Sequence, residues 1–286
     1  MGEKRKNFLV RTITGILFVA VMVTSFISPT TMVLLFTLIT GMTVWEFCGL
    51  VNDRPYISIN RFICTVSGVY LFLAMIGFNS GMTPPTVFIP YLVSIVYLMV
   101  SELYLKAKDP INNWAYTMLS QLYIALPFSL LAVLAFRSDS YEVKYTYLMP
   151  LSVFVFLWIN DAGAYICGSL LGRHKLFPRI SPGKSWEGSI GGGLLVAAAA
   201  ILIWYLTDHY QVNDLGLTAL EWAGLGVVVV VFGTWGDLIE SLFKRTLGIK
   251  DSGNILPGHG GMLDRFDSTL MALPAAVVYL YTLTLF

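Results

Sequence analysis

Long apolar stretches separated by short polar breaks dominate the pattern of this chain. The breaks are clusters of Pro, Gly, Asn, Asp and Ser, such as Ser28-Pro29 and Lys108-Asp109-Pro110, which typically end helices. A membrane-spanning helix needs about 20 mostly apolar residues. By that length, the pattern predicts nine spans near residues 8–27, 31–51, 61–78, 86–105, 114–136, 146–169, 189–207, 219–245 and 268–286.

The composition leads to the same interpretation. Hydrophobic residues make up 56% of the 286 positions and charged residues only 12%, with a mean hydropathy of +0.72. Soluble domains carry about 25% charged residues, so much of this surface must face lipid rather than water. The sequence therefore predicts an all-α, polytopic integral membrane protein. Residues 1–286 form a single membrane domain, divided into scaffold helices over 1–145 and a second part, 146–286, that carries the long polar loops.

The positions of the basic residues predict an orientation. Sixteen of the 18 Lys and Arg residues fall on one side of the predicted spans, and only Arg137 and Lys144 fall on the other. Because loops rich in Lys and Arg stay in the cytoplasm, we expect the N-terminus there and the C-terminus outside. The net charge of +1 gives no indication of a nucleic-acid partner, and none is expected.

Acidic residues gather at the cytoplasmic ends of the last predicted helices. Asp237 and Glu240 are three residues apart, as are Asp264 and Asp267, so each pair shares one helical face. Charged groups beside a bilayer are costly and usually line a polar site. Magnesium prefers oxygen ligands and often takes one or two carboxylates together with substrate phosphates. Asp161, in the sixth predicted span, is a further candidate metal or nucleotide contact.

Groups suited to phosphate surround these acids. Ser181, Lys184 and Ser185 precede a predicted helix N-terminus, where backbone N–H groups favour anions. Basic side chains that suit phosphate oxygens lie beside the acids: Lys244, Arg245, Lys250 and Arg265. Gly260 and Gly261 let the backbone approach a ligand closely. A metal, a cationic clamp and a glycine loop predict a phosphoryl-type transfer. His259 could bind phosphate, act as an acid or base, or hydrogen-bond the loop. The structural alternative is a salt-bridge network that tethers two helices.

The polar run from Ser241 to Asp267 also resembles a known family signature. It reads Ser-x-Phe-Lys-Arg, then Lys250-Asp251-x-Gly253, and ends with His-Gly-Gly-Met-x-Asp-Arg-Phe-Asp. Over these 27 positions it is similar to the signature of phosphatidate cytidylyltransferases, the CDP-diacylglycerol synthases, with no mismatch. The segment Ser181 to Gly188 resembles an upstream block of that family, except that Gly183 stands where a Lys or Asn is expected.

The resemblance implies cytidylyl transfer from CTP to phosphatidate. It also implies a magnesium site, which a potassium ion can accompany. It implies that Asp237 and Asp264 are the leading metal ligands, with Asp161, Glu240 and Asp267 as further candidates. The basic side chains that would hold phosphates are Lys184, Lys244, Arg245, Lys250 and Arg265. It also implies a homodimer, with dimer contacts in 1–145 and catalysis in 146–286, in a bacterial inner membrane with the active site facing the cytoplasm.

Two other functions fit parts of the pattern. A CTP-dependent lipid kinase would transfer the γ-phosphoryl group and release CDP instead of diphosphate. A transporter with an ion site at the membrane midplane would also carry charges between helices, but such proteins often contain inverted repeats. The sequence contains no evident repeat, and its charges cluster at one interface, which argues against transport.

Overall fold

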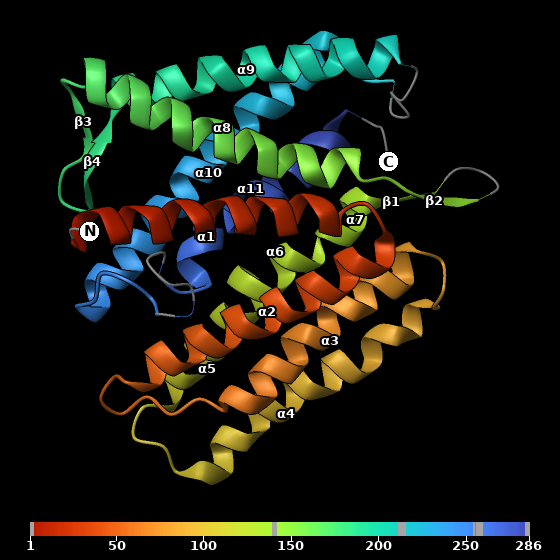
Figure 1. Cartoon of the computed structure of the whole chain (residues 1–286). Coiled ribbons are helices and arrows are strands. Elements are labelled where there is room, and N and C mark those ends of the chain that lie inside the picture. The colour runs from red at the N-terminus through yellow and green to blue at the C-terminus, as the bar shows by residue number, and fades with distance from the viewer. Residues whose placement is uncertain (1–2, 139–141, 211–215, 254, 256–259, 284–286) are drawn as a thin grey trace. The chain divides into compact units, whose positions relative to one another are not determined.

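The computed structural model describes residues 3–138, 142–210, 216–253, 255 and 260–283. These residues are mostly helical and divide into two compact units (Figure 1). The first unit contains Met1–Leu148 and Thr246–Phe266, and the second contains Met149–Arg245 and Asp267–Phe286. Helices α10 (Ala219–Leu247) and α11 (Leu263–Thr282) therefore each contribute residues to both units.

The first unit is a group of long apolar helices with local signals at their ends. Asn60 caps one helix by accepting a hydrogen bond from the Ile63 N–H, and Asp109 caps another through the Asn112 N–H. A π-helical turn precedes Pro127, which has no N–H to continue the normal hydrogen-bond ladder. The elements are α1 (Glu3–Ser25), α2 (Pro29–Asn52), α3 (Arg61–Asn79), η1 (Pro85–Phe88), α4 (Ile89–Leu105), α5 (Pro110–Leu119), η2 (Ser120–Ala125), α6 (Leu126–Ser129), α7 (Leu131–Ala135), β1 (Phe136–Ser138) and β2 (Val143–Tyr145).

Phenylalanine rings form the core of this unit. Phe36 of α2 lies 5.5 Å from Phe26 and 6.3 Å from Phe128, measured between ring centroids. Phe266, at the start of α11, packs edge-on against Phe128 at 5.4 Å and is 1% exposed. Such aromatic pairs stabilise a core beyond the area they bury. The first turn of α11 is therefore anchored among helices that lie more than 130 residues earlier in the sequence.

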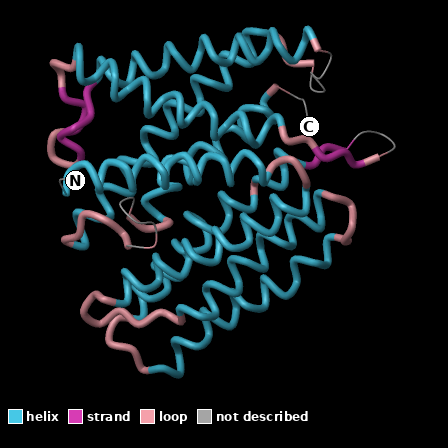
Figure 2. The backbone as a smooth tube through the Cα atoms, viewed as in Figure 1, coloured by secondary structure: helices cyan, strands magenta, loops and turns pink. Residues whose placement is uncertain are grey.

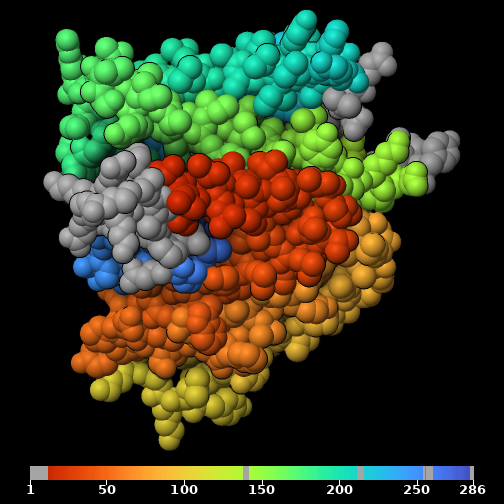
Figure 3. All heavy atoms as spheres, in the orientation of Figure 1, coloured from red at the N-terminus to blue at the C-terminus, as the bar shows by residue number. Residues whose placement is uncertain are grey.

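Helix α4 of the first unit exposes apolar side chains along most of its length. In α4 only Leu98 and Glu102 are buried, while Leu92, Val96 and Leu103 are each more than half exposed. Figure 3 shows α2, α3 and α4 side by side on the visible face. Many exposed apolar side chains along a helix of this length are typical of helices that face lipid.

The second unit joins four long helices and one hairpin. They are α8 (Leu148–Leu171), β3 (Lys175–Phe177), β4 (Ser181–Ser185), α9 (Trp186–His209), and the parts of α10 and α11 that belong to this unit. A β-carbon at Gly188 would lie 2.8 Å from the Ala164 carbonyl oxygen, and one at Gly192 would lie 2.8 Å from that of Asn160. The small residues therefore let α8 and α9 pack closely, as in other membrane helix pairs.

The predicted helices are confirmed in their main outline. Among the described residues, seven helices are long and apolar enough to cross a membrane, and helical segments overlap all nine predicted ranges. The two segments outside the seven are α1, whose apolar part is Thr12–Ser25, and α11, whose first turn carries charges. The count of nine and the orientation of the termini stay predictions.

One feature differs from the prediction. The chain is not purely helical, because β1 pairs with β2 and β3 pairs with β4 in two short antiparallel hairpins (Figure 2). Hairpins this short arise from pairing between segments and leave no periodic signal of their own. The predicted division into scaffold helices over 1–145 and catalytic helices and loops over 146–286 stays a prediction.

Candidate active site

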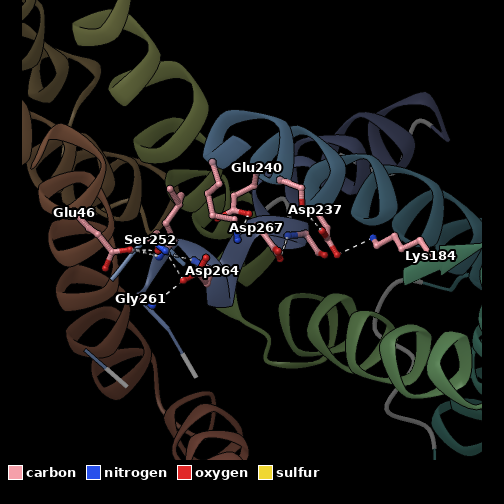
Figure 4. A network of polar contacts seen from close by, with 12 residues as sticks. Glu46, Lys184, Asp237, Glu240, Ser252, Gly261, Asp264 and Asp267 are labelled. Carbon is pink, nitrogen blue, oxygen red and sulfur yellow. Dashed lines mark hydrogen bonds and ion pairs between the residues drawn. The ribbon is translucent and has the colours of Figure 1, made fainter. Parts of the chain in front are cut away.

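An ion pair joins the hairpin to α10 in the second unit. The Lys184 ammonium lies 2.7 Å from one carboxylate oxygen of Asp237, and the other oxygen accepts a hydrogen bond from the Ser241 hydroxyl at 3.2 Å (Figure 4). The side chains of Lys184 and Asp237 are 26% and 28% exposed. A charge pair that keeps this much contact with solvent remains open to a polar ligand.

The position of Lys184 follows from the residues around it. Strand β4 ends at Ser185, whose hydroxyl oxygen accepts a hydrogen bond from the Gly188 N–H and so caps α9. Ser185 is 4% exposed, whereas Ser181 at the other end of the strand is half-buried. The structure therefore gives Ser185 a structural contact, and its predicted role in substrate binding stays a prediction.

Two further carboxylates lie near this ion pair. Asp267, half-buried in the first turns of α11, accepts a hydrogen bond from the Ser268 N–H. The charges of Asp237, Asp161 and Lys184 all lie close enough to act on Asp267 electrostatically. Asp267 therefore has two other acids and one ammonium among its charged neighbours.

Glu240 lies one turn beyond Asp237 and pairs differently. Its carboxylate is fully buried and lies 2.7 Å from the Lys244 ammonium, whose side chain is 12% exposed. The two residues are four positions apart on α10, the spacing that brings side chains together on one helix face. For Glu240 and Lys244, this geometry favours the salt-bridge alternative over direct contact with a ligand.

Asp264 belongs to a separate cluster in the first unit. One of its carboxylate oxygens accepts hydrogen bonds from the Ser252 N–H at 2.8 Å and the Gly261 N–H at 2.9 Å (Figure 4). Gly260 adopts φ = +77°, and a β-carbon there would overlap this same carboxylate oxygen. Gly260 therefore has a physical reason to be glycine, because the loop turns tightly against Asp264, whereas a β-carbon at Gly261 would overlap Glu46 and Ser252.

Glu46 is the residue of this cluster that sequence analysis missed. It lies in α2, within the part of the chain interpreted as scaffold, yet its carboxylate contacts Ser252 and the backbone at the start of α11. A signal was available, because Glu46 is the only charged residue in the 24 positions of α2. A lone acid in an apolar membrane helix is by default a candidate functional residue.

The remaining predicted residues are placed as follows. Arg245 and Lys250 are exposed, Arg265 is half-buried, and Asp161 is exposed on α8. His259 lies outside the described residues. Within the described part of the chain, no group of three or more His, Cys, Asp or Glu side chains is arranged to hold a metal ion alone.

Comparison with known proteins identifies the family. The model of the cytidylyltransferase family matches residues 9–283 of this chain. The chain belongs to the cytidylyltransferase family. This membership makes it a nucleotidyltransferase and confirms the family expected from the run between Ser241 and Asp267.

Curated bacterial members of the family resemble the chain over most of its length. A phosphatidate cytidylyltransferase of Staphylococcus aureus (strain COL) is 32% identical over 268 residues, which cover 93% of this chain and 96% of that protein. The protein of the same name from Staphylococcus haemolyticus is also 32% identical, over 267 residues. That from Haemophilus influenzae is 33% identical over 243 residues, covering 81% of this chain and 83% of the relative.

Proposed function

We propose that this chain is a phosphatidate cytidylyltransferase, which converts CTP and phosphatidate into CDP-diacylglycerol and diphosphate for phospholipid biosynthesis. The observation that carries the proposal is the similarity, over nearly the whole chain, to relatives of that name. The described helices support a site at a membrane surface, where a lipid phosphate can meet a soluble nucleotide.

An apolar cavity in the second unit supports a lipid substrate. The cavity has a volume of about 370 Å³ and is lined by α9, α10 and the hairpin, with Trp186 and Ile190 among its walls. A neighbouring recess shares both of these residues and adds the basic side chains of Arg173 and Lys175. An apolar cavity next to basic groups matches a molecule with acyl chains and a phosphate.

One face of α10 carries both residues that line this cavity and Asp237 of the candidate site. Val230 and Thr234 line the cavity, and Asp237 follows them at the three- and four-residue spacing of one helix face. A lipid whose acyl chain occupies the cavity would thus present its phosphate near the pair formed by Lys184 and Asp237. The lipid would enter sideways from the inner leaflet, whereas CTP would arrive from the cytosol.

The acids of the second unit fit a magnesium ion that arrives with phosphates. Magnesium is commonly held by one or two carboxylates plus substrate oxygens, and here Asp237 and Asp267 are the leading pair in that unit. Asp161 would add a third oxygen ligand in that unit. Asp264, in the first unit, stays a candidate metal ligand on the strength of the family resemblance. The ion, with potassium as an optional partner, would supply positive charge against the phosphates of CTP.

The reaction itself needs little covalent chemistry from the protein. An oxygen of the phosphatidate phosphate attacks the α-phosphorus of CTP, a new P–O bond forms, and the bond to the β-phosphate breaks to release diphosphate. Negative charge grows on the leaving diphosphate, and fixed cations stabilise it most when they are placed in advance. Lys184, Lys250 and Arg265 are the side chains that we propose for this role, with Arg245 and Lys244 nearby in sequence.

We further propose a homodimer in a bacterial inner membrane, with the catalytic loops facing the cytoplasm. The excess of Lys and Arg on one side of the predicted spans supports this orientation. Chemical cross-linking in native membranes tests the dimer independently of the activity.

The direct test is an activity measurement on the purified full-length protein in mixed micelles. The protein is incubated with phosphatidate and CTP labelled at the α- or γ-phosphate, with and without magnesium. We expect α-label in the lipid, release of diphosphate, and dependence on magnesium. γ-Label in the lipid would instead establish a CTP-dependent lipid kinase and overturn the proposal. If neither label reaches the lipid, cytidylyl transfer to phosphatidate is ruled out for the chain.

A further inference from the structure

Glu46 is a buried carboxylate on one of the helices that are long and apolar enough to cross a membrane. It lies on α2, is 7% exposed, and is the only charged residue of that helix. Burying a carboxylate in an apolar region costs free energy unless hydrogen-bond donors surround it. The hydrogen-bond donors around the Glu46 carboxylate therefore indicate the role of this residue.

Among the described residues, the donors to Glu46 come from the loop before α11 and from the first residue of that helix. One carboxylate oxygen accepts a hydrogen bond from the Ser252 hydroxyl and a second from the Leu263 N–H at 3.2 Å. The other oxygen accepts the Met262 N–H at 2.9 Å. The first N–H groups of a helix have no partner within the helix, and a negative charge stabilises them. Glu46 thus caps α11 from a position more than 200 residues earlier in the chain.

Glu46 and Asp264 are connected through the same few atoms. Ser252 donates its hydroxyl to Glu46 and its N–H to Asp264, and its hydroxyl oxygen accepts the Asp264 N–H at 3.3 Å. Gly261 donates its N–H to Asp264, and a β-carbon at Gly261 would overlap Glu46 (Figure 4). Both carboxylates accept hydrogen bonds from Ser252 and from the residues just before α11. The orientation of Asp264 therefore depends on Glu46.

We propose that Glu46 is a positioning residue for the reaction. It fixes the loop and the Asp264 carboxylate before substrates bind, and it contacts neither substrate itself. This inference rests on the proposed function, in which Asp264 belongs to the active site. Preorganised groups accelerate a reaction because they need no rearrangement in the transition state. Loss of Glu46 should therefore lower kcat more than it raises KM.

The test compares two matched variants, Glu46→Gln and Glu102→Gln. Glu102 is also a buried acid of the first unit, 8% exposed, but its described partner is the Asn113 side-chain amide at 3.0 Å. An amide keeps one accepting oxygen, which suffices for Glu102, whereas Glu46 uses both oxygens. We expect Glu46→Gln to lower kcat on the order of 10- to 100-fold, with KM for CTP and phosphatidate changed less than about threefold. Glu102→Gln should remain near wild type.

Hydrogen exchange gives a readout that needs no activity. In Glu46→Gln without substrate, the amides of Ser252, Gly261, Met262 and Leu263 should exchange faster than in wild type, while Glu102→Gln leaves them protected. Unchanged kcat together with unchanged exchange in Glu46→Gln would overturn the inference. Equal losses of kcat and of thermal stability in both variants would also overturn it, because Glu46 would then be merely structural. An inactive wild type would refute the proposed function instead, and the exchange measurement would still test the Glu46 contacts.

Discussion

At the scale of single residues, we expect the ion pair of Lys184 and Asp237 to matter for activity but little for stability. Each side chain is only about three-quarters buried, and pairs that keep contact with solvent contribute about 0.2–1 kcal/mol at most. We expect Asp237→Asn to lower cytidylyl transfer by a factor on the order of 100 or more, while the unfolding temperature changes little. Activity and thermal unfolding are measured on the same preparation. Asp208→Asn, an exposed acid at the far end of α9, is the matched control and should retain activity.

Gly260 offers a second test at this scale. Gly260 and Gly248 both have positive φ angles, +77° and +73°, but only at Gly260 would a β-carbon meet a neighbour, the Asp264 carboxylate. Gly248→Ala should cost only backbone strain of about 1 kcal/mol. Gly260→Ala carries the same strain and also displaces Asp264, so its activity should fall far below that of Gly248→Ala. Equal activities of the two variants would show that the position of Asp264 is unimportant.

At the scale of elements, the contact between α8 and α9 depends on individual glycines. A β-carbon at Gly192 would lie 2.6 Å from the Asn160 side-chain oxygen, whereas one at Gly193 would meet nothing closer than 3.6 Å. Overpacking a tight contact typically costs about 1–3 kcal/mol. Gly192→Ala should therefore lower the unfolding temperature in detergent, and Gly193→Ala should not. A lower unfolding temperature for Gly193→Ala alone would contradict the packing described here.

At the scale of the whole molecule, the orientation in the membrane can be tested with single cysteines. The three native cysteines, Cys48, Cys64 and Cys167, are first replaced. In intact cells, a membrane-impermeant maleimide should label Ser138→Cys from outside but label Lys108→Cys only after the cells are opened, because basic loops stay in the cytoplasm. The reverse pattern would invert the predicted topology and put the catalytic loops outside.

The sequence by itself determined where the helices lie and which family the chain belongs to. Apolar length and polar breaks are local properties, so α2, α3, α9 and α10 begin and end within a few residues of the predicted bounds. The run from Ser241 to Asp267 carries its chemistry in consecutive residues, and the family match confirmed that interpretation.

Only the tertiary structure decided which of these residues meet. Local patterns place Asp264 and Lys184 on their elements, but they do not show that Glu46 holds the loop before α11 or that Lys184 pairs with Asp237. These contacts join segments that are distant in sequence or on different elements. They form when packing brings donors and acceptors together, because a buried polar group is stable only with a partner.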